Sequence, residues 1–110
     1  MDGQFEINVL SEDGVLTLEL IGELDMSSVN VLRDAFAAAG EHHPIVVVDL
    51  AELTFIDSTG ISELLRADQH LRPVGELRLR TPSDLVRRVL EITGGDHLIT
   101  DPSPDPGMPV

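Results

Sequence analysis

The segment Asp57-Ser58-Thr59-Gly60 places two hydroxyl groups between an apolar run and a helical pattern. Residues 45–50 before it are typical of a buried strand, and residues 61–66 after it predict a helix. The first amides of a helix lack internal partners and the helix dipole is positive there, so added negative charge is favoured. We predict that Ser58 carries a reversible phosphate, with Thr59 as the second choice, and that free amides at the helix start partly satisfy it.

A structural role explains the same segment. Aspartate, serine and threonine are preferred N-caps, so Asp57, Ser58 and Thr59 are three possible caps. The two interpretations are compatible, because a capping hydroxyl on an exposed loop is also a reachable phosphate acceptor. We expect a phosphate to change the domain's own stability little. Its effect on a partner packed against the loop should be large, because burying a dianion without a counter-charge is costly.

Catalytic and metal-binding interpretations fit this sequence poorly. Two hydroxyl residues separate Asp57 from Gly60, whereas the aspartic-protease signature has one, and no Gly-x-Ser-x-Gly surrounds Ser58. No phosphate-binding loop is present, because Gly60 lacks the lysine and glycine partners. The histidines show no spacing typical of metal ligands: His42, His43, His70 and His97. We therefore predict no enzymatic activity, no metal and no cofactor, and leave nucleotide binding open.

Composition narrows the choice of partners. The 110 residues carry a formal net charge of −13 and no long cluster of Lys or Arg, which argues against nucleic acid and against an anionic membrane surface. The absence of cysteine excludes a disulfide scaffold and thiol catalysis. No run approaches the roughly 20 apolar residues of a membrane helix, and the first residues lack the features of a signal peptide. We expect one cytoplasmic domain.

Alternating apolar residues predict two strands over 5–9 and 15–21, joined as an antiparallel hairpin by the turn signal Glu12-Asp13-Gly14. Helical spacing follows over 29–39, where Ser27 or Ser28 is expected to act as the cap. The remaining segments are predicted as follows: a buried strand over 45–50, a helix from Ile61 to Leu71, a strand over 77–80, a helix from Thr81-Pro82-Ser83-Asp84 to Gly94-Gly95, a short edge strand or extended cap over 97–100, and a disordered, proline-rich tail over 101–110.

This order of elements predicts an α/β fold. Strands separated by helices pair in parallel through right-handed crossovers, so the sheet should be mixed, with the N-terminal hairpin as its antiparallel part. In such sheets function collects beyond the carboxyl ends of the parallel strands. Asp57 to Gly60 should lie at that end, and Gly22 to Asp25 after the second strand should lie near it.

Three motifs, in this order, resemble the STAS domain and, more closely, the bacterial anti-sigma factor antagonists. They are Gly22-Glu23-Leu24-Asp25, the run Leu53-Thr54-Phe55-Ile56-Asp57-Ser58-Thr59-Gly60, and the closing segment from Val86 to Gly94. The resemblance covers about residues 4–100. It implies a STAS-type mixed sheet with helices packed on it, in agreement with the α/β order deduced above.

The resemblance also implies a partner switch. An unphosphorylated antagonist binds an anti-sigma factor, often a serine kinase, and so releases a sigma factor. The kinase phosphorylates the loop serine, which breaks the complex, and a serine phosphatase resets it. Carried to this chain, Ser58 is the acceptor and the docking residues are Asp25, Asp57, Ser58, Thr59, Gly60, Ile61, Ser62 and Glu63. A STAS scaffold outside sigma control, on a lipid transporter or in a stress-signalling assembly, is the alternative, and self-association stays open.

Ile61-Ser62-Glu63 departs from the family pattern, which commonly has a large apolar residue, a small one and another apolar one. Ser62 is still small, but Glu63 introduces a charge that we place on the first helical turn. We interpret Glu63 either as a helix-start acid favoured by the dipole or as a residue that tunes partner choice by requiring a basic contact.

Overall fold

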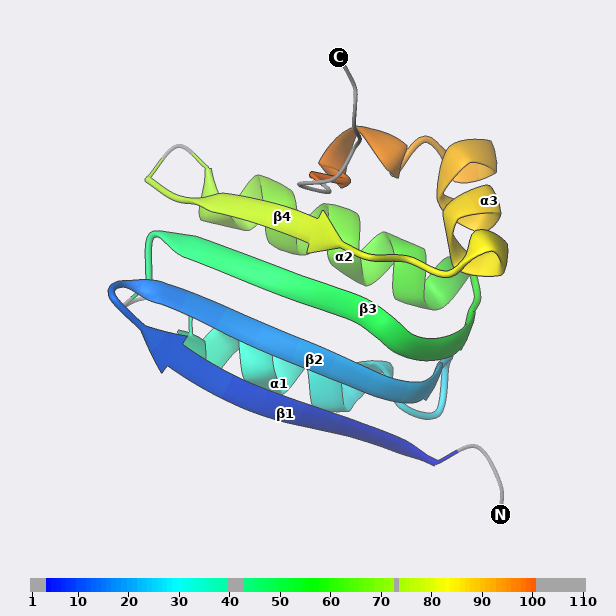
Figure 1. Cartoon of the computed structure of the whole chain (residues 1–110), viewed down its shortest axis with the longest axis horizontal. Coiled ribbons are helices and arrows are strands. Elements are labelled where there is room, and N and C mark those ends of the chain that lie inside the picture. The colour runs from blue at the N-terminus through cyan, green and yellow to red at the C-terminus, as the bar shows by residue number, and fades with distance from the viewer. Residues whose placement is uncertain (1–3, 40–42, 73, 101–110) are drawn as a thin grey trace.

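The computed structural model describes residues 4–39, 43–72 and 74–100, with nothing described for the side chain of Ala39. The elements are β1 (Phe5–Glu12), β2 (Val15–Leu24), α1 (Val29–Ala39), β3 (Ile45–Ile56), α2 (Ser58–Leu71), β4 (Glu76–Arg80), α3 (Asp84–Thr93) and a 3-10 turn (Asp96–Leu98). The strands form one sheet in the order β1-β2-β3-β4 (Figure 1). The predicted tail, residues 101–110, and Gly40 lie outside the described residues.

The sheet confirms the predicted mixture of pairings. β1 and β2 are antiparallel, and their two-residue connection is Asp13-Gly14, where both residues have positive φ, 54° and 80°. That conformation matches the twist of a tight hairpin and explains the Asp-Gly signal. β2 pairs with β3, and β3 with β4, in parallel. Within the described residues no helix is long and apolar enough to cross a membrane.

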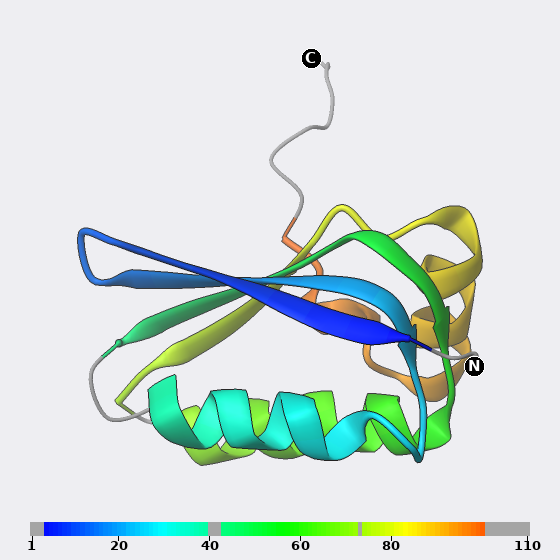
Figure 2. The same ribbon diagram turned by 90° about the horizontal axis from the view of Figure 1, so that it is seen from below.

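The two longest helices, α1 and α2, lie side by side on one face of the sheet (Figure 2). The apolar positions of the alternating strands point toward them: Leu16, Leu18 and Leu20 of β2 are at most 4% exposed. The uninterrupted run Val46 to Val48 is buried too, as expected for a central strand. α3 packs at the end of the sheet and buries Val86 and Leu90 in the same core.

The segment 97–100, predicted as a short edge strand or an extended cap, contains only one strand-like contact. Its first residues form the 3-10 turn, and only Ile99 pairs with Leu79 of β4 as an isolated parallel bridge. The amide of Thr100 donates to the carbonyl of Leu79 at 2.8 Å. Gly94, with φ of 85°, ends α3, and the chain therefore turns back before it can extend along β4.

Candidate functional site

The site is formed by the two loops that follow β2 and β3. Leu24 and Ile56 are register partners at the ends of these parallel strands, and the amide of Asp57 donates to the carbonyl of Leu24 at 3.2 Å. Asp25 directly follows Leu24 and Asp57 directly follows Ile56. The two acids therefore lie at the same end of the sheet. The sequence predicted this juxtaposition, and the strand register produces it.

Asp57 is the N-cap of α2. Its Oδ1 accepts hydrogen bonds from the amides of Thr59 at 2.9 Å and Gly60 at 3.1 Å, and its carbonyl accepts from the amide of Ile61 at 3.0 Å. Ser58 is the first residue of the helix, and its side chain is exposed. Of the three possible caps the carboxylate of Asp57 takes the role, and the exposed residue Ser58 does not have to cap the helix.

This capping corrects the expectation that free amides would partly satisfy a phosphate on Ser58. The amides of Thr59 and Gly60 already donate to Asp57. A phosphate on Ser58 would therefore be flanked by a carboxylate that holds those donors. The helix dipole still favours an anion at this end, but most of the phosphate's oxygens would have to be satisfied by water or by a partner.

Replacing Asp57 tests which group caps α2. Asp57→Ala should lower the free energy of unfolding by about 1 kcal/mol, within the range for a lost N-cap, because two amides lose their acceptor. Asp57→Asn should retain most of the stability, since its amide oxygen can accept the same bonds. Ser58→Ala is the matched control and should unfold at the same urea concentration as the parent. A loss on Ser58→Ala equal to that on Asp57→Ala would show that the serine caps instead.

Asp25 organises the start of α1 in the same way. Its Oδ1 accepts from the amide of Ser27 at 2.9 Å and from the hydroxyl of Ser27 at 2.7 Å, and its carbonyl accepts from the amides of Ser28 and Val29. The hydrogen bond from the Ser27 side chain is the main reason that the pKa of Asp25 lies below its usual value. Ser28, one of the two predicted caps, directly precedes α1, and its carbonyl accepts from the amide of Val31 at 3.0 Å, while the acid of the Gly22–Asp25 motif shapes the turn before it.

Ser28 ties this turn to the strand before it. It is 4% exposed, its hydroxyl donates to the carbonyl of Glu23 at 2.8 Å, and it accepts from the amide of Asp25 at 3.0 Å. The loop after β2 is thus hydrogen-bonded at both ends. These hydrogen bonds hold the turn that carries Asp25 against the end of β2.

Gly60 lets α2 pack closely on the two strand ends. A Cβ at this position would lie 2.8 Å from Cγ of Leu24 and 2.9 Å from Cγ1 of Ile56, both core atoms. Gly60→Ala gains helix propensity of about 1 kcal/mol, but overpacking typically costs about 1–3 kcal/mol. We expect a net loss in the free energy of unfolding, measured by urea titration. Ser62→Ala, an exposed position of the same helix, is the control, and a stabilised Gly60→Ala would contradict this packing.

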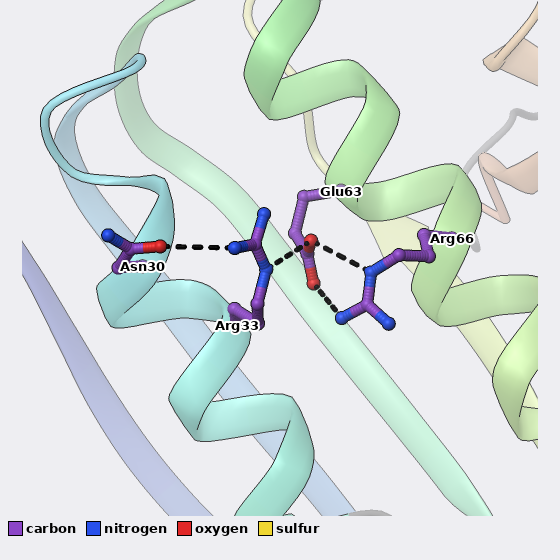
Figure 3. A network of polar contacts seen from close by, with 4 residues as sticks. All are labelled: Asn30, Arg33, Glu63 and Arg66. Atoms are coloured by element: carbon purple, nitrogen blue, oxygen red, sulfur yellow. Dashed lines mark hydrogen bonds and ion pairs between the residues drawn. The ribbon is translucent and has the colours of Figure 1, made fainter.

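Glu63 does not lie where the sequence analysis placed it. It is the sixth residue of α2, the first turn holds no acid, and the residue is 2% exposed. Its carboxylate binds two arginines of the same chain (Figure 3). Oε1 accepts from Nε of Arg33 and from Nε of Arg66, both at 3.1 Å, and Oε2 accepts from Nη2 of Arg66 at 2.8 Å.

The basic contact that Glu63 was expected to require from a partner is therefore present within the chain. Burial alone would raise the pKa of Glu63, but the hydrogen bonds from Arg66 and Arg33 outweigh it, so that the pKa lies below its usual value. Nη1 of Arg33 also donates to Oδ1 of Asn30 at 3.1 Å. The network therefore links α1 to the buried side of α2, the helix that begins at Ser58.

The remaining predicted docking residues differ in how far they are exposed to solvent. Ser62 is exposed, Thr59 is half-buried, and Ile61 is 3% exposed and belongs to the core. Two apolar side chains that the sequence analysis passed over are exposed beside the site: Met26, 75%, in the loop after β2, and Phe55, 42%, near the end of β3. Phe55 lies with Thr54 in an exposed pair between the buried residues Leu53 and Ile56, and an exposed aromatic side chain beside a loop is a signal of a contact surface.

Within the described residues no group of three or more His, Asp or Glu side chains could hold a metal ion. The arrangement instead combines an exposed hydroxyl, two hydrogen-bonded carboxylates and two exposed apolar side chains. The family model described as "Mlab, STAS domain" matches residues 7–100.

The chain belongs to the STAS domain family.

Two anti-sigma factor antagonists are similar to it over most of their length. The anti-sigma-B factor antagonist of Bacillus subtilis (strain 168) is 25% identical over 94 residues, which cover 84% of this chain and 86% of that protein. The crystal structure of an anti-sigma factor antagonist from Mycobacterium paratuberculosis superposes with a TM-score of 0.83 at 25% identity and covers 96% of this chain and 92% of that one.

A third relative is the anti-sigma factor antagonist SpoIIAA. Its unphosphorylated form has a TM-score of 0.77 at 25% identity and covers 92% of this chain and 90% of that one. Its phosphorylated form, from Bacillus, has the same fold, with a TM-score of 0.71 at 24% identity over 92% of this chain and 93% of that one. The predicted STAS-type architecture is confirmed by these neighbours and by the family match.

Proposed function

We propose that this STAS domain is an anti-sigma factor antagonist. In its unphosphorylated form it binds an anti-sigma factor, which is itself a serine kinase, and so releases a sigma factor. Phosphorylation of Ser58 ends the binding and a serine phosphatase restores it. The observation that carries the proposal is the exposed hydroxyl of Ser58 at the start of α2, beside Asp25 and Asp57, in a chain that resembles antagonists along almost its whole length.

The docking surface we propose consists of the two loops and the first turns of α2. Met26 and Phe55 supply its apolar contacts, and Ser58 and Ser62 are exposed polar residues on it. An interface core of this kind is apolar, with a polar rim. Ile61 and Gly60 contribute by holding α2 against Leu24 and Ile56 rather than by direct contact. Glu63 contributes by fixing α1 to α2.

The physical basis of the switch is the cost of a dianion in a closed interface. A phosphate adds about −1.5 to −2 charges next to the Asp57 carboxylate, which already holds the nearby amides. In the free domain water solvates this charge. In a complex that excludes water the phosphate would be buried without a cation, at a cost of several kcal/mol.

A STAS scaffold outside sigma control is the second candidate, because the same fold occurs within a murine anion transporter, Slc26a9, where the matching part is 14% of the transporter chain. The relatives that match over most of their length include named antagonists, which favours the first candidate. The two differ in what they bind and in whether Ser58 controls the binding.

A comparison of two baits separates the candidates. Ser58→Ala and Ser58→Asp proteins are immobilised side by side in a lysate of the source organism, and bound proteins are identified by mass spectrometry. We expect an anti-sigma factor on the alanine bait and its loss from the aspartate bait. Incubation of the parent with that partner and ATP should then add one phosphate at Ser58. Equal capture of a transporter component by both baits would favour the scaffold function.

A further inference from the structure

β1 is the open edge of the sheet. It pairs with β2 on one side over its whole length, without a register shift. At the opposite edge, β4 is partly covered by the bridge from Ile99 and the hydrogen bond from Thr100. Natural proteins blunt exposed edges with Pro, bulges or charged side chains, Lys above all; β1 contains no Pro, Lys or bulge, and its charged residues are Glu6 and Glu12. Val9 and Leu10 on this strand are 58% and 54% exposed.

The hairpin geometry determines which main-chain groups point outward. In a hairpin closed by two residues, the pair next to the turn, Glu12 and Val15, is hydrogen-bonded, and such pairs then alternate along the strands. The bond from the amide of Glu23 to the carbonyl of Gln4 at 3.2 Å agrees with this alternation. The amide and carbonyl groups of the odd residues, Phe5, Ile7, Val9 and Ser11, therefore face away from β2.

We propose that this edge pairs with β1 of a second copy of the chain, in an antiparallel, two-fold arrangement that places Asn8 opposite Asn8 of the second copy. In this register every outward-facing residue has an outward-facing partner: Ile7 with Val9, and Phe5 with Ser11. Four hydrogen-bonded pairs form, which supply about eight main-chain hydrogen bonds. The result is a continuous sheet across two chains, a symmetric and self-closing contact.

Side-chain charge selects this register over its neighbours. Glu6 lies opposite Leu10 and Glu12 opposite Gln4 of the second copy, so no two carboxylates face each other. A shift by two residues in one direction sets Glu6 opposite Glu12. A shift in the other direction takes Ser11 out of the pairing within β1 and leaves three hydrogen-bonded pairs instead of four.

A groove between β1 and α1 is available for side chains of the second copy to pack against. It has a volume of about 310 Å³ and is lined mainly by apolar side chains, among them Val9, Leu16, Leu18, Ala35 and Ala38. The odd residues of β1 oppose Leu20, Leu18 and Leu16, so they lie on this face of the sheet. In the proposed register Phe5 and Ile7 of the second copy stand beside Ser11 and Val9, at the edge of the groove.

The test is the association state of the full chain, measured by sedimentation equilibrium over a range of concentrations. The parent should show a monomer–dimer equilibrium that strengthens with salt, because two chains of charge −13 repel each other. Val9→Asp should raise the dimer dissociation constant by more than about tenfold, because it places a carboxylate against Ile7 of the second copy. Val74→Asp adds the same charge at a position 81% exposed elsewhere, and should dimerise like the parent.

Hydrogen exchange supplies a readout specific to the edge. The amides of Ile7 and Val9 should become protected as the protein concentration rises, while those of Asn8 and Leu10 are protected at all concentrations. Val9→Pro removes an outward amide without breaking the hairpin and should abolish the dimer. A parent that stays monomeric at all concentrations, or a Val9→Asp protein that dimerises as tightly as the parent, would overturn the proposal. Ser58→Asp should leave dimerisation unchanged, which separates this test from the proposed switch.

Discussion

A carboxylate at position 58 should weaken binding of the anti-sigma factor by about 2–5 kcal/mol, which is roughly a thirtyfold or greater rise in Kd. Ser58 is exposed at the start of α2, and the nearby amides of Thr59 and Gly60 already donate to Asp57. These two amides are therefore not free to satisfy a new carboxylate that is closed into the interface. Ser58→Ala removes only a hydroxyl and should bind like the unphosphorylated parent.

Calorimetric titration of the purified partner into each variant measures this difference. Gln69→Glu is the matched control, because it adds one negative charge to the exposed surface of the same helix, three turns further on. If the position of the added carboxylate, rather than net charge, causes the loss of affinity, Gln69→Glu should bind like the parent. Equal weakening by Gln69→Glu and Ser58→Asp would mean that general repulsion causes the effect.

Removing both arginines of the Glu63 network should lower the free energy of unfolding by about 3–5 kcal/mol. In Arg33→Ala/Arg66→Ala the carboxylate of Glu63, 1% exposed, keeps its buried place but loses both partners. The control is Arg78→Ala, which breaks the ion pair between Arg78 and Glu76. Because Glu76 is 54% exposed, losing this pair should lower the free energy of unfolding by at most about 1 kcal/mol. Urea unfolding of the three proteins at neutral pH measures the difference.

Replacing the acid instead of the arginines should have a far smaller effect. Glu63→Met fills a similar volume with an apolar side chain and leaves Arg33 and Arg66 about half exposed to water, so we expect near-parent stability. A loss as large as that of the double arginine variant would contradict the view that the buried carboxylate is the costly group.

The response to acid should reverse between parent and double arginine variant. In the parent the pKa of Glu63 is lowered, so its contribution to stability is present above the unfolded pKa of about 4.3 and is lost as the pH falls toward the folded value. Without the arginines, burial should raise this pKa. The stability deficit of the variant should therefore shrink on acidification, because protonation neutralises the buried carboxylate.

The sheet and its hairpin could be predicted because their signals are local. The Asp13-Gly14 turn, the alternation of residues 15–21 and the apolar run from Ile45 each indicate one conformation and one face. The position of Ser58 at a strand–helix junction followed from the same patterns. Of the two alternatives predicted for residues 97–100, a short edge strand or an extended cap, the strand is reduced to one bridge at Ile99, because a 3-10 turn over Asp96–Leu98 follows the left-handed Gly94.

The role of Glu63 could not be predicted, because it depends on an arginine 30 residues earlier in the chain. Helix spacing places Glu63 on the inner side with Leu64 and Ala67, which could have indicated burial. An acid at such a position is expected to have a buried partner, but nothing local to α2 identifies Arg33 in α1. The sequence likewise offered several adjacent side chains as helix caps and did not distinguish among them: Asp57, Ser58 and Thr59 before α2, and Ser27 or Ser28 before α1.

The most direct test of the switch is the affinity of the isolated anti-sigma factor for the same protein before and after stoichiometric phosphorylation of Ser58. Calorimetry should give tight binding of the unmodified form and no measurable heat with the modified form, while treatment with a serine phosphatase restores the original titration. If the modified and unmodified forms bind with the same Kd, the hydroxyl at the start of α2 does not control docking on this surface.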